Sequence, residues 1–230
     1  MDLLQSREID TVLDSVYKVN IVSLPVLTQL LSSESAEPGC TRAKKYAVLD
    51  QENGKEIFNG FDISGNRNDP NMRGFTLTFP SPSEKSVLHC GYRYSAAFST
   101  MEFSSPTGPV GVFNRDGLGL GLLGFLCPFL CLCCCFPVAT ASIKDARTGD
   151  QLLKGGAYLL PRKIDMSRPS NLGGRKIGVI HLGGILMNQT ITLSFEQFAN
   201  PSEKLLLIGL GAGMMDYEQF HLAHQQSSRY

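Results

Sequence analysis

Five cysteines fall within nine residues near the middle of the chain, and they are the side chains best suited to chemistry. They are Cys127, Cys131, Cys133, Cys134 and Cys135. A metal site takes thiolates that converge on one ion, usually from two paired turns, and only Cys131 and Cys134 have the two-residue gap of such a turn. Adjacent cysteines in an apolar segment suit S-palmitoylation at a membrane interface instead. We favour acylation; the alternatives are a metal site, a catalytic thiol and a buried structural cluster.

Other residues offer little support for catalysis. The four histidines have no hydrolase or metal spacing with the acidic residues. Gly119–Gly124 (GLGLLG) has the spacing of a dinucleotide-binding fingerprint, but that motif needs a strand before it and a helix after it. Here a stretch rich in Pro and Cys follows. We predict that the protein is not an enzyme.

Charge and composition exclude several other classes. The 21 Lys and Arg residues balance the 21 Asp and Glu residues, so bulk electrostatics cannot hold a nucleic acid. The 43% hydrophobic content predicts a folded core. The N-terminus lacks the basic and apolar regions of a signal peptide. We therefore predict a cytosol-facing protein with reduced thiols.

One group of basic residues is a candidate surface for anionic lipid headgroups, where each cation contributes about 1 kcal/mol near the membrane. A solvated face is the alternative. The group consists of Arg162, Lys163, Arg168, Arg175 and Lys176.

The elements that must position these side chains are mostly strands. The clearest pair is Lys45–Asp50 and Lys55–Ser64, joined through Asn53-Gly54, a sequence that allows the positive φ of a tight hairpin turn. Short runs of the same type recur at Val16–Val22, Phe75–Phe79, Ser86–Tyr94, Val110–Phe113, Thr140–Lys144, Gln151–Leu153, Lys176–Leu182 and Thr190–Phe195. Roughly ten to twelve strands at this spacing predict a closed or nearly closed antiparallel sheet. We expect a single domain over residues 1–230.

The cysteines lie inside a long uncharged segment. Gly117 to Ile143 is a run of 27 residues without a charge, which is long enough for a membrane span. Pro128 and Pro137 each remove a backbone donor and disfavour a continuous helix. We predict an apolar loop that leads into a strand, with residues 117–139 as the membrane-anchoring segment; a true span is the alternative.

A second apolar segment lies near the C-terminus and predicts a helix over residues 202–220, with Ser202 as its cap. Leu205–Met215 is a run of eleven residues without a charge, which as a helix covers only about 16 Å, half of a bilayer core. A helix that is apolar on every side and this short belongs inside a protein. We expect the following residues to be buried: Leu205, Leu206, Leu207, Ile208, Met214 and Met215. The predicted fold class is mainly β, a closed antiparallel barrel around a buried C-terminal apolar helix.

The order of these motifs resembles the phospholipid scramblase family over nearly the whole chain. The corresponding residues are Ile9-Asp10, Lys45–Asp50 with Gly54, Cys127–Cys135, and Leu205–Met215 followed by Asp216–Phe220. The resemblance implies a tubby-like barrel of twelve strands around the C-terminal helix. It also implies palmitoylation and calcium-linked movement of phospholipids between leaflets, at the cytoplasmic face of a membrane such as the plasma membrane.

Two features depart from the family pattern. The cysteine run follows the Pro-Gly segment Pro106–Gly111 instead of preceding it, and only Cys90 stands near the family's palmitoylated position. The stretch that corresponds to the acidic calcium segment, Met187–Glu196, contains Glu196 as its single carboxylate, whereas calcium takes several carboxylate oxygens. Calcium is therefore implied by the resemblance alone.

Two functions follow as expectations. The first is a membrane-associated protein of the scramblase family that moves phospholipids between leaflets. The alternative is an acylated lipid-binding or adaptor module without transport activity. A phospholipid membrane is the expected partner in both cases, and the sequence indicates no particular protein partner.

Overall fold

The structure is a computed structural model of the 230-residue chain, and it describes residues 7–24, 44–63, 71–80, 85–95, 98–116, 139–158, 162–183 and 190–227. The described residues form twelve strands, two α-helices and one short 3-10 helix, η3 (Ser170–Leu172). Helix α1 is Arg7–Leu13 and helix α4 is Pro201–Ser227. The strands are β1 (Lys18–Ser23), β2 (Lys44–Asp50), β3 (Glu56–Asp62), β4 (Met72–Thr78), β5 (Ser86–Arg93), β6 (Thr100–Ser105), β7 (Gly108–Asp116), β8 (Ala139–Asp145), β9 (Gln151–Tyr158), β10 (Lys163–Ser167), β11 (Lys176–Leu182) and β12 (Thr190–Phe195).

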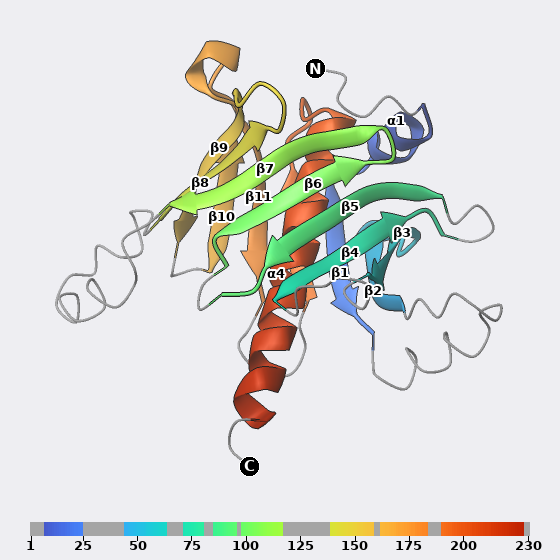
Figure 1. The fold of residues 1–230 in the computed structure, drawn as a ribbon. Helices are drawn as coiled ribbons and strands as arrows, with labels where there is room; N and C mark the ends of the chain where they lie inside the picture. The colour runs from blue at the N-terminus through green and yellow to red at the C-terminus, as the bar shows by residue number, and fades with distance from the viewer. Residues whose placement is uncertain are drawn as a thin grey trace, which may run out of the picture.

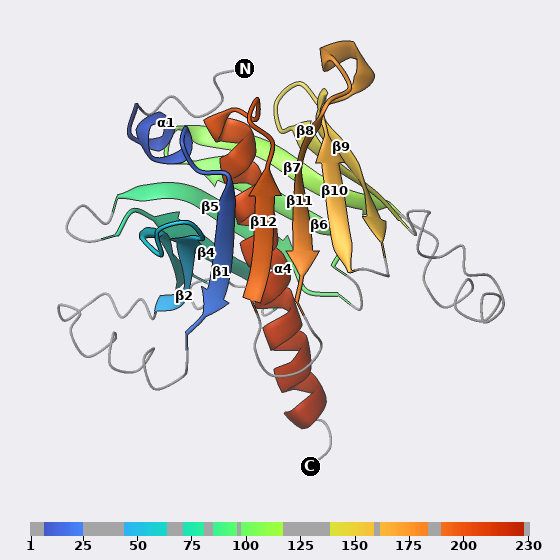
Figure 2. The same ribbon diagram turned by 180° about the vertical axis from the view of Figure 1, so that it is seen from behind.

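The strands form one closed antiparallel barrel (Figures 1 and 2). Each strand pairs with its neighbours in the sequence, and β12 closes the barrel by pairing with β1, with Leu193 opposite Val19. Closure leaves no sheet edge exposed. The predicted fold class is confirmed.

Burial alternates along some strands, such as β10 and β12, and is continuous along others, such as β3 and β4. In β12 (TITLSF), Ile191, Leu193 and Phe195 are buried while the polar residues between them are partly exposed. Successive side chains of a strand point to opposite faces, so the apolar set of β12 faces the interior.

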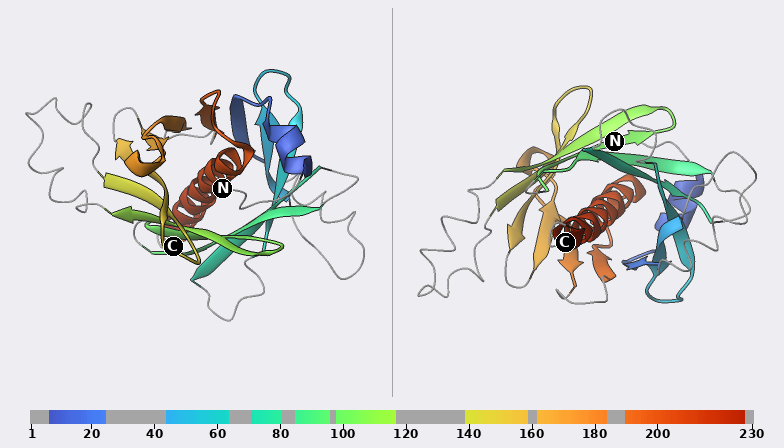
Figure 3. Two further views of the ribbon diagram at one scale, coloured as in Figure 1. Left: turned by 90° about the horizontal axis from the view of Figure 1, so that it is seen from above. Right: turned by 60° about the horizontal axis from the view of Figure 1, so that its bottom comes forward.

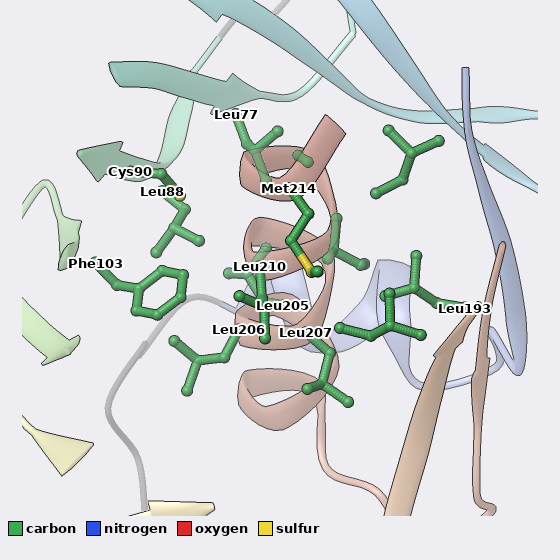
Figure 4. Close-up of a cluster of buried hydrophobic side chains, with 14 of the residues drawn as sticks. Leu77, Leu88, Cys90, Phe103, Leu193, Leu205, Leu206, Leu207, Leu210 and Met214 are labelled. Carbon is green, nitrogen blue, oxygen red and sulfur yellow. The ribbon is translucent and has the colours of Figure 1, made fainter. Parts of the chain in front are cut away.

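Helix α4 runs through the middle of the barrel and emerges at one end, as the view along the barrel in Figure 3 shows. Leu205, Leu206, Leu207 and Ile208 are at most 1% exposed, and Met214 and Met215 are also buried. They pack against Leu88, Phe103 and Leu193 of the barrel wall (Figure 4). The helix fills the interior with apolar side chains.

The glycines of α4 are positions where the barrel wall comes close to the helix backbone. A β-carbon at Gly209 would lie 2.7 Å from Leu88 Cδ2 and 3.2 Å from Phe103 Cε1. One at Gly211 would lie 3.0 Å from Ile21 Cδ1. Each glycine costs about 1 kcal/mol of helix propensity against alanine, and this close packing offsets that cost.

The first turn of α4 is fixed by a capping box. The Asn200 side-chain oxygen accepts a hydrogen bond from the Glu203 amide at 2.8 Å, and Glu203 Oε2 accepts one from the Asn200 amide at 2.9 Å. Arg168 then donates two hydrogen bonds to the Glu203 carboxylate, at 2.7 and 2.9 Å. The cap is therefore Asn200 and not Ser202, and the helix begins at Pro201.

Helix α1 covers part of the same barrel end and is held there by a lysine of α4. Lys204 Nζ donates hydrogen bonds to the carbonyl oxygens of Leu13, at 2.8 Å, and Asp14, at 3.1 Å. Lys204 thus adds a side-chain donor to carbonyls at the end of α1, of which Leu13 O also accepts from the Val16 amide. Burial lowers the pKa of Lys204, partly opposed by Asp14.

The structure corrects several predicted boundaries. The hairpin at Asn53-Gly54 is confirmed, with Gly54 at φ +69°. Strands β6 and β10 were not predicted, because neither Thr100–Ser105 nor Lys163–Ser167 contains a run of apolar residues. Helix α4 continues to Ser227 instead of ending at residue 220, since the residues after Phe220 include no Gly or Pro to stop it. Residues 117–138 of the predicted anchoring segment lie outside the described residues.

We expect Leu207→Asp to unfold the barrel. Leu207 is fully buried among apolar side chains (Figure 4), and a carboxylate there costs several kcal/mol, a large share of the stability of a domain. Thermal melting followed by circular dichroism should lose its cooperative transition. Gln151→Asp places the same charge on the exposed start of β9 and should melt like the unmodified protein. A cooperatively melting Leu207→Asp barrel would contradict the buried position of the helix.

Candidate functional site

The two barrel ends differ, and the end from which α4 emerges carries the richest group of polar and aromatic contacts. We call it the exit end, and the opposite end, where α4 begins, the entry end (Figures 1 and 2). Lys45 of β2, Arg73 of β4, Tyr92 of β5 and the following Tyr94 contact α4 at this end, and Asp62 of β3 pairs with Lys45.

Asp216 of α4 is the centre of a buried polar group at the exit end. Its side chain is only 5% exposed. Tyr92 Oη donates a hydrogen bond to Asp216 Oδ2 at 2.7 Å, and Lys45 Nζ donates to Asp216 Oδ1 at 3.3 Å. Lys45 also pairs with Asp62 at 2.6 Å. We call Lys45, Asp62, Tyr92 and Asp216 the exit latch, because they join three strands to the helix.

The electrostatics of the exit latch favour its paired form. Burial alone would lower the pKa of Lys45, but the charges of Asp216 and Asp62 outweigh burial, and the pKa of the Lys45 ammonium lies above its ordinary value. Burial and the nearby Asp216 carboxylate raise the pKa of Tyr92 far above that of a free tyrosine. At neutral pH the latch therefore contains a charged lysine and a neutral tyrosine.

Aromatic side chains surround α4 where it leaves the barrel. Tyr94 packs edge-on against Phe220 at 4.7 Å between ring centroids, and its hydroxyl lies 2.8 Å from His221 Nδ1. The guanidinium carbon of Arg73 lies 3.6 Å from the centroid of the Phe220 ring, a cation–π contact. Lys163 makes a second such contact with Tyr158 at 4.7 Å. We call Arg73, Tyr94, Tyr158, Lys163 and Phe220 the exit rim.

A hollow of about 180 Å³ opens between the exit latch and the exit rim. Its lining residues are Lys45, Arg73, Asp216, Gln219 and Phe220. The hollow therefore combines two cations with one carboxylate and a phenyl ring.

The five clustered cysteines lie in residues 117–138, outside the described residues. The segment joins Asp116 of β7 to Ala139 of β8. The β6–β7 and β8–β9 turns lie at the entry end, so β7 ends and β8 begins at the exit end. The predicted anchoring segment is thus attached to the barrel at the exit end.

Cys90, the cysteine nearest to the family's palmitoylated position, faces the barrel interior. It is 1% exposed and packs against α4 at Gly209 (Figure 4). Burial raises the pKa of the Cys90 thiol well above its ordinary value. A buried, protonated thiol is a poor nucleophile, so Cys90 serves the core and is not accessible for acylation in the folded barrel.

The predicted basic group does not form one surface. Arg162 and Lys163 lie at the exit end, where Arg162 pairs with Glu218 of α4. Arg168, Arg175 and Lys176 lie at the entry end, because β10 and β11 run in opposite directions between them. Lys163 and Lys176 both pair with Asp165, and Arg168 pairs with Glu203. The group is therefore split between the two ends and largely neutralised by carboxylates.

The described residues contain no group of three or more His, Cys, Asp or Glu side chains that could hold a metal ion. Glu196 is exposed, just after the end of β12. None of the helices described is both long enough and apolar enough to cross a membrane.

No family model, curated protein or solved structure matches this chain.

Sequence reasoning did not find the exit latch, although its parts lay in the motifs. Lys45 and Asp216 belong to the Lys-Tyr and Asp-aromatic motifs of the resemblance, 171 residues apart. The only sequence signal for their pairing was a carboxylate directly after an uncharged helix. Tyr92 and Asp62 carried no signal, since polar residues near strand ends are common.

Asp216→Asn should weaken the exit latch without unfolding the barrel. The amide keeps the size of the side chain, and Lys45 keeps Asp62 as its partner, so we expect a loss of about 1–3 kcal/mol in the free energy of unfolding near pH 7. Urea unfolding measures this loss. Asp150→Asn, the same change at an exposed turn, should have no effect.

The pH dependence gives an independent check of the same variant. Because the folded state raises the pKa of Lys45, its stabilisation is fully present below the unfolded pKa, about 10.4, and is lost as the pH rises through the folded value. Tyr92 acts in the same direction above about pH 10. The unmodified protein should lose stability more steeply than Asp216→Asn above about pH 10. If the free energy of unfolding falls equally with pH in both proteins, Asp216 does not couple stability to the ionisation of Lys45 and Tyr92.

Proposed function

We propose that the protein works on phospholipid membranes as a scramblase-type barrel, without enzymatic chemistry. In this proposal, acyl chains on the cysteine run hold it at the cytoplasmic face of a membrane such as the plasma membrane. The observation that carries this proposal is the architecture. The motif order implied twelve strands around a C-terminal helix, and the described residues fold as twelve strands around α4.

Chain geometry supports the exit end as the membrane-facing end. Cys135 precedes Ala139 by four residues, and an extended chain spans at most about 3.6 Å per residue. Cys135 therefore lies within about 14 Å of the start of β8, and Cys133 within about 22 Å. The two barrel ends are about 25 Å apart along α4, which is the length of Pro201–Tyr217 at 1.5 Å per residue. Acyl chains on these cysteines would thus hold the exit end near the bilayer and leave the entry end in the cytosol.

The chemistry of the exit rim supports the same orientation. Tyrosine rings with one polar end favour the interface between lipid and water. Arg73 lies over the Phe220 ring, where its charge can meet anionic headgroups at about 1 kcal/mol. The exit rim and the acylated segment would then contact one membrane together.

Two activities fit this placement, and the packed interior favours one of them. Leu205–Met215 fills the barrel, so a single barrel offers no lipid path through its centre. Phospholipid binding at the membrane surface, as an acylated lipid-binding or adaptor module, is therefore the activity that the geometry supports best. Movement of phospholipids between leaflets, which the resemblance implies, is the second and needs a route outside the barrel.

Vesicle reconstitution distinguishes the two activities. The acylated protein is added to vesicles of phosphatidylcholine and phosphatidylserine that contain a fluorescent lipid, and an impermeant reductant quenches the outer leaflet. With binding alone, the protein should float with the vesicles while quenching stops at the value of protein-free vesicles. Quenching beyond that value, with or without calcium, would show that the protein moves phospholipids between the two leaflets. A protein that neither floats nor increases quenching would contradict the proposal.

Replacement of Cys127, Cys131, Cys133, Cys134 and Cys135 by Ser should move the protein from the membrane to the cytosolic fraction. The reason is that each acyl CH₂ contributes about 0.8 kcal/mol of membrane affinity. Cys90→Ala is the control, because that thiol is buried and should not affect fractionation. Membrane residence that survives loss of all five cysteines would indicate a true span instead of an acyl anchor.

A further inference from the structure

A groove at the entry end has the shape and charge of a small-molecule site that the membrane function does not use. It lies between α1 and the β2–β3 turn and has a volume of about 630 Å³. Specific ligand sites in proteins fall in the range of roughly 300–1,000 Å³. The groove is lined chiefly by α1, by the β2–β3 hairpin and by Phe79 and Pro80 after β4.

The floor of the groove is apolar. Val16, Ile57 and Phe79 form its buried part, each at most 8% exposed. Val12 of α1 and Pro80 extend this floor as partly exposed side chains. Such a strip accommodates a hydrocarbon chain, whose apolar surface leaves water when it is covered.

The rim of the groove has unpaired cations, whereas its carboxylates already have partners. Glu8 pairs with Lys85 at 3.0 Å and Glu56 pairs with Lys44 at 2.7 Å. Asp50 accepts hydrogen bonds from the Glu52 amide and the Asn53 side chain.

Arg7 and Lys55 are exposed, and neither has a carboxylate partner within the part of the chain that the structure describes. Arg7 and Lys55 outnumber Asp50, whose hydrogen bonds come from uncharged groups, so the net charge left at the rim is positive.

The wall that α1 provides is held firmly in place. Ile9 and Leu13 of α1 are buried in the main core, and Lys204 binds the carbonyls at the end of the helix. The groove is thus formed before any ligand arrives, which reduces the ordering cost of binding.

We propose that this groove binds a single-chain anionic amphiphile, with the hydrocarbon chain on the Val12, Ile57 and Phe79 floor and the anionic head between Arg7 and Lys55. Fatty acids and lysophospholipids share this chemistry. The site lies at the entry end, about 25 Å of helix away from the exit rim. It takes a lipid monomer from solution, so the proposal does not depend on the membrane attachment of the barrel.

Isothermal titration of the full chain tests the proposal with two probes, dodecanoate and a dodecanoyl lysophosphatidate, both below their micelle concentrations. We expect saturable one-to-one binding of at least one probe, and the pair of titrations distinguishes a carboxylate head from a phosphate head. Dodecanol, which has the same chain without the charge, should bind at least tenfold more weakly. One-to-one binding of neither anion by the folded protein would overturn the proposal.

Variants locate the binding in the groove. The double variant Arg7→Gln, Lys55→Gln should weaken binding by about 10–100-fold, which corresponds to about 1.4–2.7 kcal/mol for the two exposed cations together. The matched control is Lys144→Gln, Arg147→Gln, which removes two exposed cations elsewhere and should bind as the unmodified protein does. Both double variants should keep the melting temperature. Equal weakening by the two double variants would assign the binding to general charge and overturn the groove as its site.

Discussion

The constraint on which the structure depends is that a closed barrel of twelve strands has a lumen that must be filled. Eight strands already enclose a space that their own side chains just fill, and the diameter grows with the number of strands. An α-helix with its side chains is about 10–12 Å across and suits the wider lumen. Helix α4 meets this need with an uncharged run that is apolar on every side, while glycines accommodate the nearest wall residues. Without α4 the barrel would enclose a large void or water against apolar walls.

Charged groups on α4 are confined to the two ends of its buried run, and they fix its position along the barrel axis. Glu203 and Lys204 bind Arg168 and the end of α1, while Asp216 binds Lys45 and Tyr92. A displacement of the helix by one turn, about 5.4 Å, would leave these buried charges unpaired. The interior is therefore a fixed core. The two surfaces proposed to bind other molecules, the exit rim and the α1 groove, lie at the two ends of this core.

The sequence predicted the parts of the fold that local patterns control. Alternating apolar residues marked most strands, Asn53-Gly54 marked a hairpin, and the uncharged run Leu205–Met215 marked the buried helix. It could not predict what long-range pairing controls. Strands β6 and β10 are stabilised by their neighbours more than by their own composition. Arg162 and Arg168 are separated because β10 carries the chain from the exit end of the barrel to the entry end. The exit latch joins residues 171 positions apart, which no local pattern reveals.

The central claim is that α4 is the permanent core of the barrel, and native-state hydrogen exchange tests it most directly. The measurement compares the amides of Leu205–Asp216 with the slowest amides of β1 and β12, the strands that close the barrel. If the helix fills the lumen, its amides exchange only through global unfolding and give the same opening free energy as those strands. Exchange of the α4 amides at a clearly lower free energy, while β1 and β12 stay protected, would show a barrel that persists without its helix and would contradict the account.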